Sequence, residues 1–197
     1  MVLGLLVLSN SSFAMSDEFY NSESWYNSKE MNTTLSLVKQ YNSTGCNSAD
    51  KENCDEISKE ISKQFMNPMF KTSAFEYIMF QLHPKRDNYI GGEMFMLQGD
   101  ELNLSSMALR GKFELVEQIL RSDTFKEEEK EPYFVDLRKD FYKSSSLHQD
   151  YVYSTCGVET ASWTNGSGSG TSHMRCVTDY NLKYLEILDE IIGTLNF

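Results

Sequence analysis

The chain has 197 residues, of which 13% are aromatic and only 3 are proline, and its formal net charge is -11. This length suits one domain with its own hydrophobic core, and the abundance of Phe and Tyr favours a folded chain over a disordered one. The negative charge repels phosphate backbones, which argues against nucleic-acid binding. It favours a basic protein partner by electrostatic steering, although the same charge also serves solubility.

Residues 1–14 have the pattern of a secretory signal peptide. Val2 to Leu8 are almost purely apolar, and Ser12 and Ala14 occupy the small-residue positions of an A-x-A-like cleavage site. The apolar run is far shorter than the roughly 20 residues that span a bilayer. The positively charged n-region is missing, which favours a true start upstream of Met1; the alternative is a buried N-terminal helix. We therefore expect a periplasmic or secreted protein with no membrane insertion after cleavage.

The mature chain, residues 15–197, is predicted to form a single helical domain. Residues 15–30 are polar and aromatic and are expected to form a loose arm. A first helix is predicted over 30–42. A second helix is marked by Ile57, Ile61 and Phe65, which repeat every four residues, and it ends at Asn67-Pro68.

The segment 69–98 is a dense block of methionine and aromatic residues interrupted by His83-Pro84 and Gly91-Gly92. Its pattern fits a buried helix or a short strand equally well. Such blocks are more often hydrophobic core than ligand pocket, so we expect these side chains to be buried.

From Asp100 onward the helical period is clear. A helix is predicted over 101–121, followed by a charged connector over 122–131 and by a helix that starts near Pro132 and leads to Cys156. The last helix is expected from about Cys176. Its inward residues would be Val177, Tyr180, Tyr184, Ile187, Ile191 and Leu195. The sequence thus predicts an all-α fold, an antiparallel bundle of four to five helices.

The four cysteines form two pairs that are close in sequence, Cys46 with Cys54 and Cys156 with Cys176. Four cysteines allow three connectivities, and we expect the two local disulfides. The glycine- and serine-rich stretch between Cys156 and Cys176 is expected to be a flexible loop that the second disulfide closes. Residues 166–174 of this stretch also resemble an engineered linker. A zinc site of Cys156, His173, Cys176 and His148 is the competing interpretation, but its spacing fits no common zinc motif.

No constellation in the sequence indicates catalysis. Only His83, His148 and His173 could act as a base beside a nucleophile. His83 precedes a proline, His173 lies in the expected loop, and His148 lies on the apolar stripe of its helix, where a structural histidine is the more common case. The common hydrolase and phosphate-binding motifs are missing. We therefore expect neither an enzyme nor a cofactor or metal site, while a carboxylate pair hidden among the many acidic residues stays an alternative.

The C-terminal half, residues 100–197, resembles the LprI-like lysozyme-inhibitor family of bacterial envelope proteins. The resemblance is carried by Asp100-Glu101-Leu102-Asn103 at the opening of a helix, by Tyr151, Cys156, Cys176 and Leu188, and by Cys46 and Cys54 as early cysteines. The chain differs from the family at Val152-Tyr153, which replace an Arg-Asp pair, and at Tyr184, which replaces an Arg. The family's Trp before the Tyr is Leu147 or His148. The resemblance implies a helical envelope protein that inhibits a muramidase.

We therefore expect a protein-binding inhibitor, with a lysozyme-type cell-wall hydrolase as its target. An immunity protein against a secreted toxin and an envelope hydrolase are the alternatives. The acidic surface suits a basic partner such as a lysozyme or a toxin. Candidate contact residues are Trp163, as an anchor in the loop 163–173, and the acidic connector Asp123, Glu127, Glu128, Glu129 and Glu131. The sequence does not indicate an oligomeric state.

Overall fold

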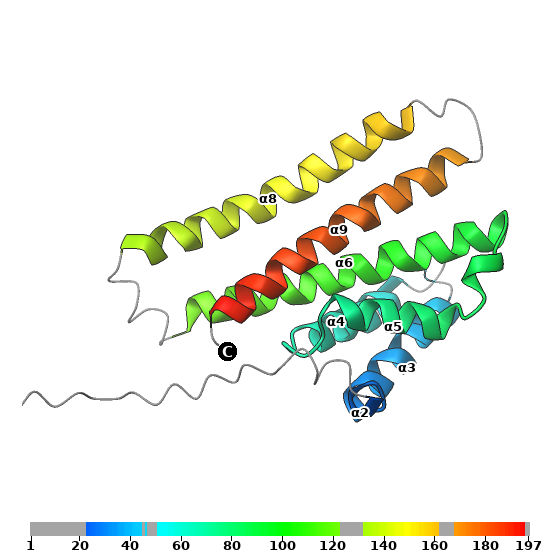
Figure 1. Cartoon of the computed structure of the whole chain (residues 1–197), viewed down its shortest axis with the longest axis horizontal. Helices are drawn as coiled ribbons and strands as arrows, with labels where there is room; N and C mark the ends of the chain where they lie inside the picture. Colours follow the sequence, from blue (N-terminus) through cyan, green and yellow to red (C-terminus); the bar gives the residue numbers. More distant parts are fainter. Residues whose placement is uncertain (1–22, 45, 47–50, 123–131, 162–167, 196–197) are drawn as a thin grey trace, which may run out of the picture.

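The computed structural model describes residues 23–44, 46, 51–122, 132–161 and 168–195 (Figure 1). In chain order they form α2 (Glu23–Tyr26), α3 (Lys29–Ser43), α4 (Lys51–Phe65), α5 (Thr72–Leu82), the 3-10 turn η1 (Arg86–Asn88), α6 (Gly92–Arg121), α8 (Pro132–Ala161) and α9 (Gly168–Thr194). The regular structure of these residues is entirely helical, so the predicted all-α bundle is confirmed. None of the described helices is long and apolar enough to cross a membrane.

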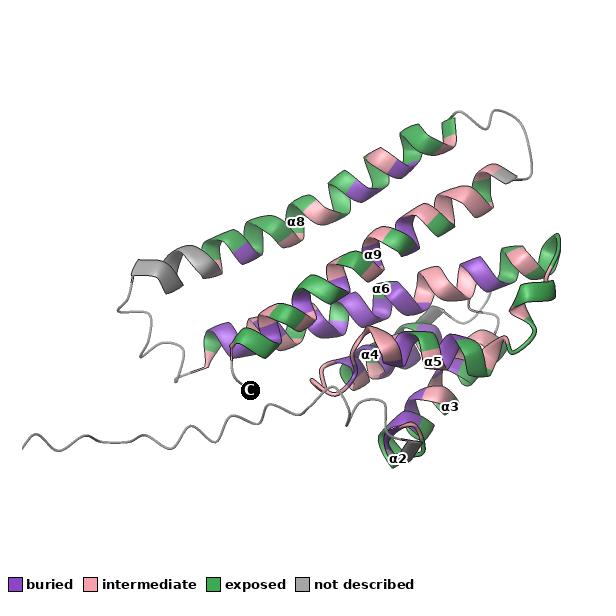
Figure 2. Ribbon diagram, viewed as in Figure 1, coloured by how far each residue is buried: buried purple, intermediate pink, exposed green. Residues whose placement is uncertain are grey.

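Helix α6 is the centre of the bundle. It packs along α9 on one side and against α4 and α5 on the other, while α3 packs on α4 (Figure 1). Buried residues follow almost the whole length of α6 and the facing sides of its neighbours (Figure 2). The core therefore forms around this helix, because it can bury residues on more than one face.

The contact between α4 and α6 depends on Gly111. A Cβ atom built at this position would lie 2.1 Å from the Ser62 carbonyl oxygen and 2.9 Å from Phe65 Cβ. Both distances are too short for non-bonded atoms, so any larger residue would separate the two helices. The missing side chain thus sets how closely α4 approaches α6.

The contact between α6 and α9 contains a buried ion pair. Lys112 is fully buried, and its Nζ lies 2.8 Å from Oδ1 of Asp189, whose side chain is 13% exposed. The other carboxylate oxygen of Asp189 accepts the Thr72 backbone N–H at 3.2 Å, at the start of α5. Burial lowers the pKa of Lys112, and the Asp189 carboxylate acts in the opposite direction. One carboxylate thus joins three helices.

Helix α8 is the outermost element and packs mainly on α9 (Figure 1). A small second core joins the two helices, made by Val152, Cys156 and Val177. The Cys156–Cys176 disulfide crosses this core, with Cα atoms 5.7 Å apart, and the Cys46–Cys54 disulfide links Cys46, just after α3, to α4. Both predicted pairings are confirmed, and the bridged cysteines exclude the zinc site considered for Cys156 and Cys176.

The loose arm expected over 15–30 is wrong for its second half. Trp25 is buried, with its ring edge-on to Phe70 at a centroid distance of 5.4 Å, and Tyr26 stacks on Tyr77 at 4.4 Å. Ser28 caps the next helix by accepting the Met31 N–H at 3.1 Å. The polar composition of this segment did not indicate that Trp25 and Tyr26 pack against Phe70 and Tyr77, before and within α5. The predicted signal peptide, residues 1–14, lies outside the described residues.

The structure decides one alternative that the sequence left open and corrects two further expectations. The sequence left residues 69–98 open between helix and strand, and the structure places α5 and the first two turns of α6 there. Helix α9 begins at Gly168, so the segment that contains His173 is helical and not a flexible loop. Gly170 is helical despite its weak helix propensity. Ile187, expected to face inward, is 48% exposed.

Substitution of Gly111 tests the close approach of α4 and α6. We expect Gly111→Ala to lower the free energy of unfolding by about 1–3 kcal/mol, because the new methyl group overpacks a closed interface. At Gly99, in the same helix, no atom lies within 4 Å of the position that a Cβ would take. Gly99→Ala should therefore raise stability by up to about 1 kcal/mol through helix propensity alone. Urea unfolding followed by circular dichroism measures the stability of both variants. Equal changes in the same direction would contradict the role of Gly111 in the packing of α4 on α6.

A double-mutant cycle tests the buried ion pair. Asp189→Ala leaves the Lys112 ammonium buried without its counter-ion, and we expect a loss of about 3–5 kcal/mol in the free energy of unfolding. The double variant Lys112→Met/Asp189→Leu should recover most of this loss, because apolar side chains of similar volume can occupy the site. Unfolding in urea of the unsubstituted chain, Lys112→Met, Asp189→Leu and the double variant gives the four values of the cycle, and Asp189→Ala is measured beside them. A loss below about 1 kcal/mol for Asp189→Ala would mean that the pair behaves like an exposed one.

Candidate functional site

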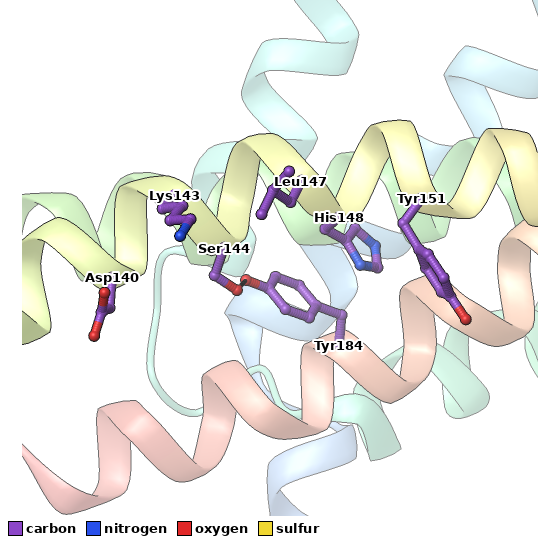
Figure 3. Close-up of a pocket in the computed structure, with 7 residues that line it drawn as sticks. All are labelled: Asp140, Lys143, Ser144, Leu147, His148, Tyr151 and Tyr184. Carbon is purple, nitrogen blue, oxygen red and sulfur yellow. Dashed lines mark hydrogen bonds between the residues drawn. The ribbon is translucent and has the colours of Figure 1, made fainter.

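An open groove of about 390 Å³ lies between α8 and α9 (Figure 3). Its lining combines aromatic, apolar and charged side chains. Six of them come from α8 and one from α9: Asp140, Lys143, Ser144, Leu147, His148, Tyr151 and Tyr184. The size falls within the range of small-ligand and peptide sites, although this groove is shallow and faces solvent.

The floor of the groove is a fixed stack of His148 on Tyr184. The two rings are 4.2 Å apart and nearly parallel, at 16°. The Tyr184 hydroxyl lies 2.7 Å from the Ser144 hydroxyl (Figure 3). His148 Nε2 lies 3.5 Å from Asn181 Oδ1, and the buried Asn181 amide in turn donates to Ser105 Oγ at 3.2 Å. These contacts tie α8 to α9 and α9 to α6.

The contacts of His148 are those of a structural residue. Ser144 bonds the Tyr184 hydroxyl, whereas the imidazole bonds an amide, so neither the Ser144 nor the Tyr184 hydroxyl is paired with the ring nitrogen. Nucleophilic catalysis would need that pairing. Burial lowers the pKa of His148, and the bond to Asn181 partly opposes this effect. The geometry agrees with the interpretation of His148 as a satisfied histidine on a packed helix face.

A second polar cluster surrounds Asp100 at the start of the segment that resembles the inhibitor family. Its Oδ2 lies 2.9 Å from His83 Nε2 and accepts the Asn42 amide at 2.9 Å. The Tyr89 ring meets the His83 ring edge-on at 5.7 Å. Burial raises the pKa of Asp100, while His83 acts to lower it. The cluster joins α3, the end of α5 and α6, and it presents an acid beside a base without a paired nucleophile.

Several large apolar side chains are exposed at the turn before α6 and in the first turns of that helix. Ile90 is 79% exposed, Met96 66% and Phe95 53%. The three residues are close in sequence, in the turn that precedes α6 and in its first two turns. We call Ile90, Phe95 and Met96 the apolar end. Exposed clusters of this kind mark interaction sites.

The apolar end was not predicted from the sequence. Phe95 and Met96 belong to the methionine and aromatic block that was expected to be buried, and Ile90 was not singled out. The signal that could have indicated exposure is local. Polar residues Lys85 to Asn88 and the pair Gly91-Gly92, with Gly91 at a φ of +54°, mark a tight turn at the surface.

The contact residues predicted from the sequence differ from those of the apolar end. Trp163 and the acidic residues Asp123, Glu127, Glu128, Glu129 and Glu131 lie outside the described residues. The four cysteines are placed and bridged in two disulfides. Within the described part of the chain, no three His, Cys, Asp or Glu side chains are grouped so as to hold a metal ion.

Comparison with protein-family models, curated proteins and solved structures found no match. The resemblance to the LprI-like inhibitors therefore rests on the sequence motifs alone.

The protonation of His148 can be measured directly. We expect its pKa to lie below the usual value of about 6.5, because burial disfavours the charged imidazole. As the pH falls, the unfolded chain therefore binds a proton at His148 before the folded chain does. The contribution of His148 to stability is therefore complete above about pH 6.5 and declines as the pH falls through the folded-state pKa.

Histidine NMR titration gives the pKa, with His148→Gln to assign the signal. The pH dependence of unfolding should be weaker in His148→Gln than in the unsubstituted chain, whereas His173→Gln serves as the matched control. A His148 pKa at or above 6.5 would contradict the role of burial.

Proposed function

We propose that this chain works outside the cytosol as a protein-binding inhibitor and that its target is a lysozyme-type muramidase. The observation that carries the binding role is the apolar end, where three large apolar side chains are more than half exposed. A monomeric surface seldom leaves such side chains together without a function. Apolar and aromatic side chains are also the usual energetic centre of a protein interface.

The apolar end is supported by a rigid base. Phe95 and Met96 stand on the first two turns of α6, a helix of 30 residues. A surface held in this way loses little conformational entropy on binding. Two disulfides also suit an oxidising compartment such as the periplasm or the extracellular space.

Charge supports a basic target. The net charge of -11 would attract a basic protein and speed its association. Acidic residues are spread over most elements, so the charge favours a class of partner without selecting a face. The connector Asp123–Glu131 contributes five acidic residues against two lysines in its sequence. Trp163 lies in sequence between Ala161 and Gly168, the last residue of α8 and the first of α9. The choice of a muramidase follows from the resemblance to the LprI-like family.

Titration of the oxidised mature chain into cell-wall lysis assays with a panel of muramidases tests the proposal. We expect stoichiometric inhibition of at least one enzyme, weakened by salt because screening reduces steering. The variant Ile90→Ser/Met96→Ser should weaken inhibition at least about tenfold, since anchor side chains at an interface centre are each worth 1 kcal/mol or more.

Ile187→Ser provides the matched control. Ile187 is an exposed apolar residue of α9, about 28 Å along the helix from Gly168 at 1.5 Å per residue, and its loss should leave inhibition unchanged. No inhibition across the panel would overturn the muramidase assignment. Inhibition that is equally insensitive to both variants would retain the inhibitor and exclude the apolar end as its contact surface.

A further inference from the structure

Helix α8 buries only one of its faces. It contains 30 residues and is therefore about 45 Å long, yet it packs mainly against α9. Among residues 138–161 only Phe141, Val152 and Cys156 are buried, and the rest of the helix surface is largely exposed (Figure 2). Helices of a bundle normally pack against two neighbours. The outer side of α8 has no such second neighbour within the described part of the chain.

The outer face of α8 carries charged, apolar and polar side chains at helical spacing. Lys143, Leu147, Asp150 and Ser154 recur at intervals of three and four residues, so they form one stripe, half a turn away from the buried residues. All four are exposed, and Leu147 is 53% exposed. No ion pair among the described residues involves the side chain of Lys143 or Asp150. The stripe is therefore an apolar centre, Leu147, with Lys143 on one side and Asp150 on the other, and Lys143 and Leu147 also form the rim of the groove beside α9.

When a second copy of the stripe runs in the opposite direction, each cation of one copy faces an anion of the other. In an antiparallel pair of α8 helices with the twofold axis beside Leu147, Lys143 of each copy lies next to Asp150 of the other. The two Leu147 side chains meet at the centre, with Tyr151 on their flanks. We infer that α8 is the contact helix of a symmetric dimer of this chain. Two α8–α9 hairpins then form a four-helix layer, and each α8 gains its second neighbour.

The occupant is a second copy because the stripe carries both charges in reciprocal order. A basic partner of the kind proposed as the target would meet Lys143 as well as Asp150, so one of its contacts would be repulsive. A twofold axis, in contrast, forms two equivalent attractive pairs. The apolar end lies outside this interface, since Ile90, Phe95 and Met96 belong to α6 and the turn before it. Dimer formation thus goes beyond the proposed inhibition and does not depend on it.

Sedimentation equilibrium over a range of protein concentrations tests the dimer. We expect a reversible monomer–dimer equilibrium. Each single reversal, Lys143→Asp or Asp150→Lys, should raise the dissociation constant at least about tenfold, because it changes two symmetric pairs from attraction to repulsion. The double swap Lys143→Asp/Asp150→Lys should restore the original constant. A structural effect of one site could not produce this rescue.

The controls separate the interface from net charge and from folding. Lys59→Asp changes the net charge by the same amount as Lys143→Asp, on an exposed position of α4, and should leave the constant unchanged. Leu147→Ser should weaken the dimer while the thermal midpoint at low concentration stays the same, since Leu147 is exposed in the monomer. A chain that stays monomeric at every concentration overturns the inference. A dimer without rescue by the double swap, or one unaffected by Leu147→Ser, overturns it as well.

Discussion

Two consecutive residues of α6 determine how the helices on its two sides are held. Gly111 has no side chain, which lets α4 approach until its Ser62 carbonyl leaves no room for a Cβ atom. The next residue, Lys112, points about 100° further around the helix and pairs with Asp189 of α9. The contact between α4 and α6 depends on the missing side chain of Gly111, and the contact between α6 and α9 depends on a buried charge. Both tolerate little change, since overpacking strains a closed interface and an unpaired buried ammonium is costly.

The ion pair also explains the position of α5. Asp189 accepts the Thr72 N–H as well as the Lys112 ammonium, so the start of α5 is fixed by a residue of α9 that lies 117 positions later. Trp25 and Tyr26 then pack on the aromatic residues Phe70 and Tyr77 around the same helix. The N-terminal helices are thus held by the C-terminal helix, although the two parts look separate in the sequence. This long-range closure favours a single cooperative domain.

The features that were predicted correctly depend on local pattern. Ile57, Ile61 and Phe65 repeat at the helical period and are all buried, and both cysteine pairs are close in sequence. The features that were missed depend on the tertiary fold. No periodicity distinguishes a buried Phe75 from a 53% exposed Phe95, and no composition indicates that Lys112 is fully buried. The candidate site therefore moved from the residues with the most conspicuous chemistry, Trp163 and the acidic connector, to apolar side chains that the fold leaves uncovered.

The two proposed surfaces have a geometric relation that follows from antiparallel pairing. The apolar end lies at the start of α6, whereas the proposed dimer contact is centred near the middle of α8. A twofold axis across α8 reverses the direction of the second copy, so the two apolar ends would point away from each other. Two target molecules could then bind one dimer without sharing space. Such an arrangement gives no gain in avidity towards a single soluble enzyme, because one target cannot reach both ends. It would increase retention where targets are themselves arrayed, as muramidases bound along a cell wall are, because the second binding event is then intramolecular.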